Sequence, residues 1–112
     1  MAYLVKKMND LLEQKIHYST LFSYYGGLLT ERQQAIFKAY YEEDYSLAEI
    51  GEAFKISRNA VHDCLKQATS NLEQFESVLH LVELNAKREA IYEKYKEQGT
   101  KEELIKELKE ME

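Results

Sequence analysis

The sequence predicts an all-α fold, on the basis of three observations. The 112 residues include no proline and only four glycines. No alternating run of β-branched residues is closed by a Gly or Asn turn, as a strand would require. Apolar residues recur instead at intervals of three and four along most of the chain. A chain of this length fits one small domain, or a compact core with an appended helix.

The first helix is expected near residues 4–25, and the Gly26-Gly27 pair ends its pattern. Its apolar positions are Leu4, Met8, Leu11, Leu12, Ile16, Leu21, Phe22 and Tyr25. Thr30 then begins a second helix, in which Gln33 completes a capping box, a pair of side chains that bond each other's backbone N–H groups. The apolar stripe of this second helix extends to about Glu42.

Residues 46–68 have the spacing of a helix-turn-helix motif. Its apolar positions are Leu47, Ile50, Ala53 and Phe54 in one helix and Val61, Cys64, Leu65 and Ala68 in the next. Ser46 with Glu49 forms a capping box for the first helix, and Ser57 can cap the second. Gly51 stands inside the first helix, where a glycine costs roughly 1 kcal/mol relative to alanine. We therefore expect a close packing contact at Gly51.

The second helix of the motif has no stop signal after Ala68 and is expected to continue to about Leu79. Another long helical pattern follows to Gln98, where Gly99 breaks it and Thr100 begins a short last helix. The helical tail is therefore expected to consist of separate helices.

We divide the chain into an N-terminal packing helix at 1–28, a helix-turn-helix core at 29–71 and an acidic helical tail at 72–112. The formal charges of these parts are +1, −2 and −4. The core is thus acidic, although a nucleic-acid-binding domain gains most of its non-specific affinity from Lys and Arg at phosphates.

Residues 29–68, LTERQQAIFKAYYEEDYSLAEIGEAFKISRNAVHDCLKQA, resemble region 4 of bacterial sigma factors, in which a leader helix precedes a helix-turn-helix. The matching positions are Leu29, Thr30, Arg32, Gln33, Leu47, Glu49, Ile50, Gly51, Ser57, Arg58, Val61 and Ala68. Lys55 departs from the pattern, because such turns usually carry a glycine there. A left-handed backbone at Lys55 would cost around 1 kcal/mol.

Over most of its length the chain also resembles the YlxM-type family of small Gram-positive helix-turn-helix proteins. The supporting positions are Tyr24, Tyr41, Glu43, Asp44, Tyr45, Ser57, Arg58, Ala60, Val61, Leu79, His80 and Leu81. This resemblance implies a sigma-region-4-like core with a long C-terminal helical extension. It also implies a link to the signal recognition particle pathway, because the family's gene adjoins the gene of the particle's GTPase.

The outward positions of the motif's second helix are Arg58, Asn59, His62, Lys66 and Gln67. Arg58 would hold a phosphate at the helix N-terminus or reach a guanine edge, and Asn59 and His62 would face base edges. Lys66 and Arg32 would bind the phosphate backbone of the nucleic acid. The alternative is that these are ordinary solvated residues on a helix that only packs.

Two function classes remain open. The first is a cytoplasmic DNA-binding regulator, which should show a contiguous positive face around Arg32, Arg58 and Lys66. Asp63 is the exception, because it lies beside this face and would repel phosphate. The second is a protein-interaction accessory of the signal recognition particle pathway that binds no DNA. In that case the helix-turn-helix is a scaffold and the acidic tail binds a basic protein or GTPase.

The tail is expected to be a dimerisation element. Its apolar stripe includes Leu81, Leu84, Ile91 and Tyr95, and a helix this long cannot bury its stripe on one small core. A homodimer through about residues 72–108 would also suit paired DNA half-sites. The alternative is that the tail folds back on the first helix of its own chain.

The sequence gives no signal of an enzyme, a metal site or a cofactor. His62 and Cys64 are two residues apart on one helix and therefore point about 200° apart, which argues against a catalytic pair. The three histidines and the one cysteine lack metal-ligand spacing. A single cysteine suits a reducing cytoplasm, and no apolar run approaches the roughly 20 residues that span a bilayer.

Overall fold

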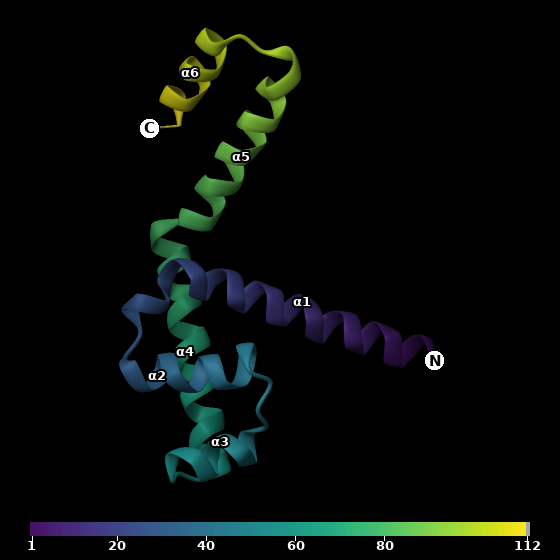
Figure 1. Cartoon of the computed structure of the whole chain (residues 1–112), viewed down its shortest axis with the longest axis vertical. Coiled ribbons are helices and arrows are strands. Elements are labelled where there is room, and N and C mark those ends of the chain that lie inside the picture. Colours follow the sequence, from purple (N-terminus) through teal and green to yellow (C-terminus); the bar gives the residue numbers. More distant parts are fainter. Residues whose placement is uncertain (112) are drawn as a thin grey trace. The chain divides into compact units, whose positions relative to one another are not determined.

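A computed structural model describes residues 1–111, apart from the side chains of residues 97 and 98. The chain divides into two compact units, residues 1–79 and the residues from His80 onward. The regular elements of the described residues are all helices, which confirms the predicted all-α class (Figure 1). The unit boundary lies at the end of a helix, a few residues beyond the position 72 where the sequence placed the start of the tail.

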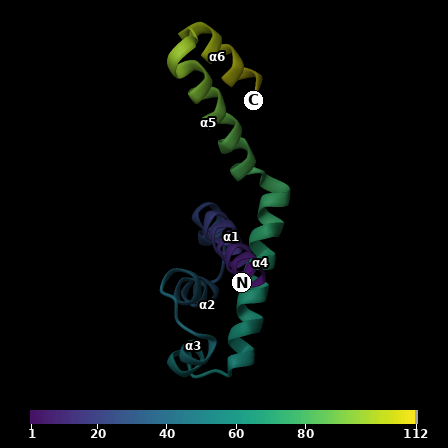
Figure 2. The same ribbon diagram turned by 90° about the vertical axis from the view of Figure 1, so that its right-hand side faces the viewer.

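The first unit is built around one long helix. Its elements are α1 (Ala2–Tyr25), the 3₁₀ turn η1 (Gly26–Leu28), α2 (Glu31–Phe37), the π-helical turn η2 (Lys38–Glu42), α3 (Leu47–Phe54) and α4 (Arg58–Leu79). Helices α1, α2 and α3 all contact α4 (Figure 2). Thus α4 contacts each of the other three α-helices of this unit.

The core of this unit contains residues from all four α-helices. Its buried members are Leu21, Tyr25, Leu29, Ile36, Phe37, Ile50, Val61, Leu65, Ala68 and Leu72. The rings of Phe22 and Phe37 stack with centroids 4.4 Å apart, and the Tyr25 hydroxyl donates to Glu76 of α4. These contacts attach the C-terminal half of α1 to α2 and α4.

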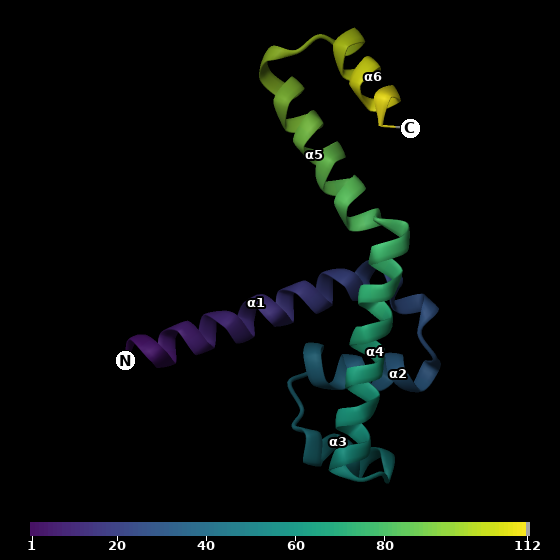
Figure 3. The ribbon, with the colours of Figure 1, turned by 180° about the vertical axis from the view of Figure 1, so that it is seen from behind.

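The sequence predicted that α1 packs along its whole length. Its N-terminal half does not pack. The apolar side chains from Leu4 to Ile16 are exposed, and only the later cluster around Leu21 and Tyr25 is buried. Figure 3 shows this half running away from the other helices of the unit. The reason is geometric, because α1 meets α4 near its own C-terminal end.

The second unit is a helical hairpin of α5 (Leu81–Gln98) and α6 (Lys101–Glu110). The two helices are tied together by Glu107, which accepts hydrogen bonds from Lys94 at 2.9 Å and from the Tyr95 hydroxyl at 2.8 Å. No described side chain of this unit is fully buried. Helix α4 ends at Leu79, where the sequence placed its end, and His80, with φ of 54°, adopts a left-handed conformation before α5 that the sequence did not indicate.

The expected helix starts are confirmed. Thr30 and Gln33 form a capping box, with the Gln33 N–H donating to the Thr30 hydroxyl at 3.1 Å. Ser46 and Glu49 form the same arrangement at the start of α3. No helix in the described part of the chain is both long and apolar enough to cross a membrane.

The turn between α3 and α4 depends on Gly51. A Cβ atom at this position would lie 2.8 Å from the carbonyl oxygen of Ile56, which is a backbone atom that cannot move aside easily. The Ile56 N–H in turn donates to the Gly51 carbonyl at 2.9 Å. Lys55 completes the turn with φ of 59°. This is a left-handed backbone at the position where such turns usually carry a glycine.

We expect Gly51→Ala to lower the free energy of unfolding by about 1–3 kcal/mol, because overpacking against backbone outweighs the better helix propensity of alanine. Thermal unfolding followed by circular dichroism measures the change. Gly27→Ala is the matched control, since nothing lies within 4 Å of its added Cβ and its φ is not positive. Equal stabilities of the two variants would contradict the packing role.

We expect Lys55→Gly to raise the free energy of unfolding by up to about 1 kcal/mol, because glycine has no Cβ to oppose a left-handed backbone. Denaturant titration compares it with Lys55→Ala, which removes the same long side chain but keeps the Cβ. A glycine variant no more stable than the alanine variant would show that the turn is unstrained.

Candidate nucleic-acid interface

The candidate interface is the exposed side of α4, which begins directly after the turn. The hydroxyl of Ser57 accepts a hydrogen bond from the Ala60 N–H at 3.0 Å, so the predicted cap is present. The first N–H groups of a helix have no intrahelical partner and carry the positive end of its dipole. The start of α4 can therefore bind an anion such as a phosphate.

The predicted contact residues of α4 are all exposed. They are Arg58, Asn59, His62, Lys66 and Gln67. Val61, Leu65 and Ala68 are buried on the adjoining side of the helix. Because each residue turns the helix by about 100°, the first four contact residues fall within a sector of about 100°.

The edge of this sector is marked by Asp63. Its side chain is 81% exposed, and one carboxylate oxygen lies 3.7 Å from Nδ1 of His62. Gln67 lies beyond Asp63 around the helix, and its amide nitrogen donates to the Asn71 side chain at 2.9 Å. The Gln67 side chain is thus hydrogen-bonded to a neighbour on α4 and lies outside the sector of the other four contact residues.

Arg32 is exposed in the first turn of α2. Burial raises the pKa of the Cys64 thiol, and the positive charge of Arg32 partly opposes this rise. A contiguous positive face around Arg32, Arg58 and Lys66 stays a prediction.

A shallow hollow borders the sector and adds Tyr40, which the sequence did not single out as a contact residue. It is lined by Gln14, Tyr18, Tyr40, Tyr41, Leu47, His62, Leu65, Lys66 and Thr69. Burial, and then the neighbouring Tyr40 and Tyr18, raise the pKa of Tyr41 to about 12, so its hydroxyl stays protonated. Tyr40 is partly exposed beside His62 and Lys66. Only the folded arrangement of α1, η2, α3 and α4 could show this neighbourhood.

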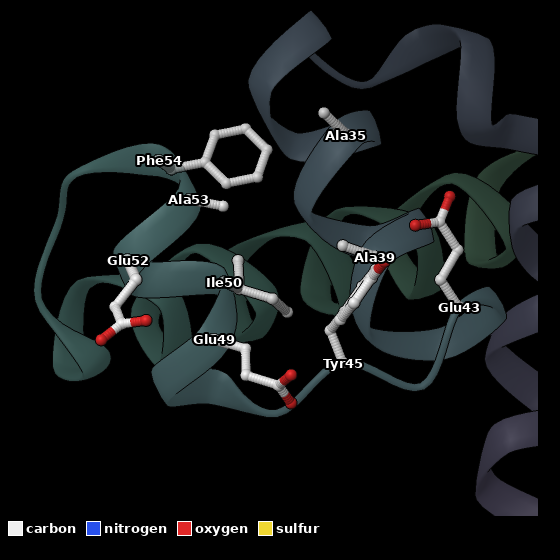
Figure 4. Close-up of a pocket in the computed structure, with 9 residues that line it drawn as sticks. All are labelled: Ala35, Ala39, Glu43, Tyr45, Glu49, Ile50, Glu52, Ala53 and Phe54. Carbon is white, nitrogen blue, oxygen red and sulfur yellow. The ribbon is translucent and has the colours of Figure 1, made fainter.

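A second surface feature is a groove between α2–η2 and α3, which we call the acidic groove (Figure 4). It is lined by Ala35, Ala39, Glu43, Tyr45, Glu49, Ile50, Glu52, Ala53 and Phe54. The Ser46 backbone N–H and hydroxyl hold the pKa of Glu49 below its usual range, so this carboxylate is charged at neutral pH. None of the lining residues comes from α4, so these acids lie away from the contact residues.

The predicted dimer residues lie on α5. Leu81 is exposed, whereas Leu84 and Ile91 are half-buried. Tyr95 is also half-buried and bonds Glu107 of α6 within its own hairpin. A homodimer interface through these residues stays a prediction.

Residues 12–111 match the UPF0122 family, which is described as "Putative helix-turn-helix protein, YlxM / p13 like". UPF0122 protein BH2485 of Halalkalibacterium halodurans is 39% identical over 99 residues, which cover 85% of this chain and 91% of that protein. UPF0122 protein YofM of Lactococcus lactis is 41% identical over 101 residues, covering 89% and 91%. A Thermoanaerobacter relative, Teth514_1714, is 55% identical over 62 residues, covering 55% and 53%. The chain therefore belongs to the UPF0122 family of YlxM/p13-like helix-turn-helix proteins.

Proposed function

We propose that this protein is a cytoplasmic DNA-binding regulator that lays the first half of α4 in the major groove of a duplex. The observation that supports this most is the separation of charge in the helix-turn-helix core. Arg58 and Lys66 project from one sector of α4, whereas the acids Glu43, Glu49 and Glu52 line the acidic groove. These three acids of the core therefore lie outside the contact sector.

Each contact residue has a definite role in this proposal. Arg58, at the N-terminus of α4, binds a phosphate together with the helix dipole, or forms a bidentate contact to guanine. Asn59 and His62 face base edges, and Lys66 binds a phosphate further along the groove. Arg32, in the first turn of α2, binds the phosphate backbone together with Lys66.

Asp63 gives the proposal a sharp test, because it is the acid at the edge of the contact sector. We expect Asp63→Asn to tighten binding to a short random-sequence duplex, since it removes repulsion from phosphate. Lys66→Ala should weaken binding uniformly across sequences and reduce the slope of log K against log salt by about 1. Fluorescence anisotropy titrations from ~50 mM salt upward measure both effects.

The same titration with Arg58→Ala separates its two possible contacts. A lost base contact costs roughly 1–3 kcal/mol and relaxes preference at one position, whereas a lost phosphate contact affects all sequences equally. These exposed substitutions should change stability by less than about 0.5 kcal/mol. Val61→Asp is the unfolding control, because Val61 is fully buried. An intact protein that binds no duplex at ~50 mM salt, where the phosphate contribution is strong, overturns the proposal.

The acidic groove favours a second candidate function, that of a protein-interaction accessory of the signal recognition particle pathway. Its lining combines apolar side chains such as Ile50 and Phe54 with three carboxylates. Such a surface fits a helix with one apolar face and flanking Lys or Arg residues. The link to the signal recognition particle rests on the family resemblance.

Binding of the purified signal recognition particle GTPase distinguishes the candidates. Under the second function, Ala53→Arg should abolish binding by placing a bulky positive charge in the groove, while Lys66→Ala should leave it intact. Under the first function, neither variant binds the GTPase, and only Lys66→Ala weakens duplex binding. Crosslinking in cells followed by recovery of nucleic acid and protein provides an independent comparison.

A further inference from the structure

The largest unexplained feature of the molecule is an apolar stripe on the N-terminal half of α1. We call it the α1 face and define it by Leu4, Val5, Met8, Leu11, Leu12 and Ile16. These residues are spaced by three and four positions, so they share one side of the helix. Each is 56–69% exposed, although all are large and apolar.

We propose that the α1 face is the docking surface for the same face of a second copy of this chain, with the two helices antiparallel. This inference does not depend on DNA binding. It follows from the area of the face, from the symmetry of its residues and from the position of the rest of the first unit.

The area matches a specific interface. The six side chains expose on the order of 600 Å², as much as the largest apolar patches on most monomers. It is also about the ~600 Å² per partner at the lower limit of standard interfaces. An isolated helix of ~12–15 residues is marginal in water, and α1 has no side-chain cap at its N-terminus. This half of α1 therefore gains its stability from whatever covers the face.

Five of the six residues of the face are arranged symmetrically about Met8, and Ile16 lies beyond them. Leu4 and Leu12 lie four positions before and after it, and Val5 and Leu11 lie three positions before and after it. In an antiparallel pair with its two-fold axis at Met8, Leu4 of one copy lies level with Leu12 of the other. Val5 is likewise level with Leu11, so the seam is apolar at these levels between residues 4 and 12. A two-fold dimer uses the same patch on both subunits, as this arrangement does.

The surroundings of the face fit the same arrangement. Lys15, which lies at the C-terminal end of the stripe, is ion-paired with Asp44 at 2.6 Å. It therefore adds no uncompensated charge to the seam. Antiparallel pairing also puts the two cores at opposite ends of the seam, where they do not collide.

The first test is the oligomeric state of the full chain, measured by sedimentation velocity from ~1 to ~50 µM. We expect a dimer whose dissociation constant rises more than about tenfold in Met8→Asp, because symmetry places two carboxylates at the apolar centre. Asn9→Asp is the matched control, since it adds the same charge about 100° around the helix. It should leave the dimer intact.

Crosslinking then tests the direction of the pair, in a Cys64→Ser background. A mixture of Leu4→Cys and Leu12→Cys chains should form a disulfide-linked heterodimer under mild oxidation, whereas Leu4→Cys alone should not. Crosslinking of Leu4→Cys with itself, without the mixed product, would overturn the antiparallel arrangement. A monomeric full chain at ~50 µM would overturn the dimer itself. A dimer that is lost in Ile91→Asp but survives Met8→Asp would overturn the α1 face and support the tail interface.

Discussion

The close approach of the Ile56 carbonyl to Gly51 is the constraint on which the rest of the first unit depends. It allows the chain to reverse direction within a few residues, so that α4 can start directly beside α3. Because α4 then continues to Leu79 without interruption, it also provides the surface on which α1 and α2 pack. A local steric requirement at one glycine thereby fixes the direction of the helix that carries both the core and the contact residues.

The same turn accounts for the separation of charge. Placing α3 across one side of α4 turns the outward residues of α3 away from the exposed sector of α4. Glu49 and Glu52 consequently face the acidic groove, where Glu49 also caps its own helix. Asp63 cannot be separated in this way, because it lies on α4 itself. An acidic core is thus compatible with a contact surface whose main charges are Arg58 and Lys66.

Much of this fold could be predicted because its signals are local. The capping boxes at Thr30 and Ser46 depend on residues three positions apart, and the cost of a mid-helix glycine indicated the contact at Gly51. The left-handed His80 and the π-helical turn at the end of α2 could not be predicted, because no Gly or Pro marks them. The way in which α2 crosses α4 is likewise specified by no spacing in the sequence.

Apolar periodicity identified which side of α1 must be covered, but it could not say what covers it. The pattern is the same in the half that packs, around Leu21, and in the half that does not, around Met8. The difference arises only from the point at which α1 crosses α4. Because a stripe more than half exposed costs solvation free energy in a lone chain, the unpacked half implies a second surface. The symmetry of the residues from Leu4 to Leu12 about Met8 makes an identical helix the partner that matches these levels.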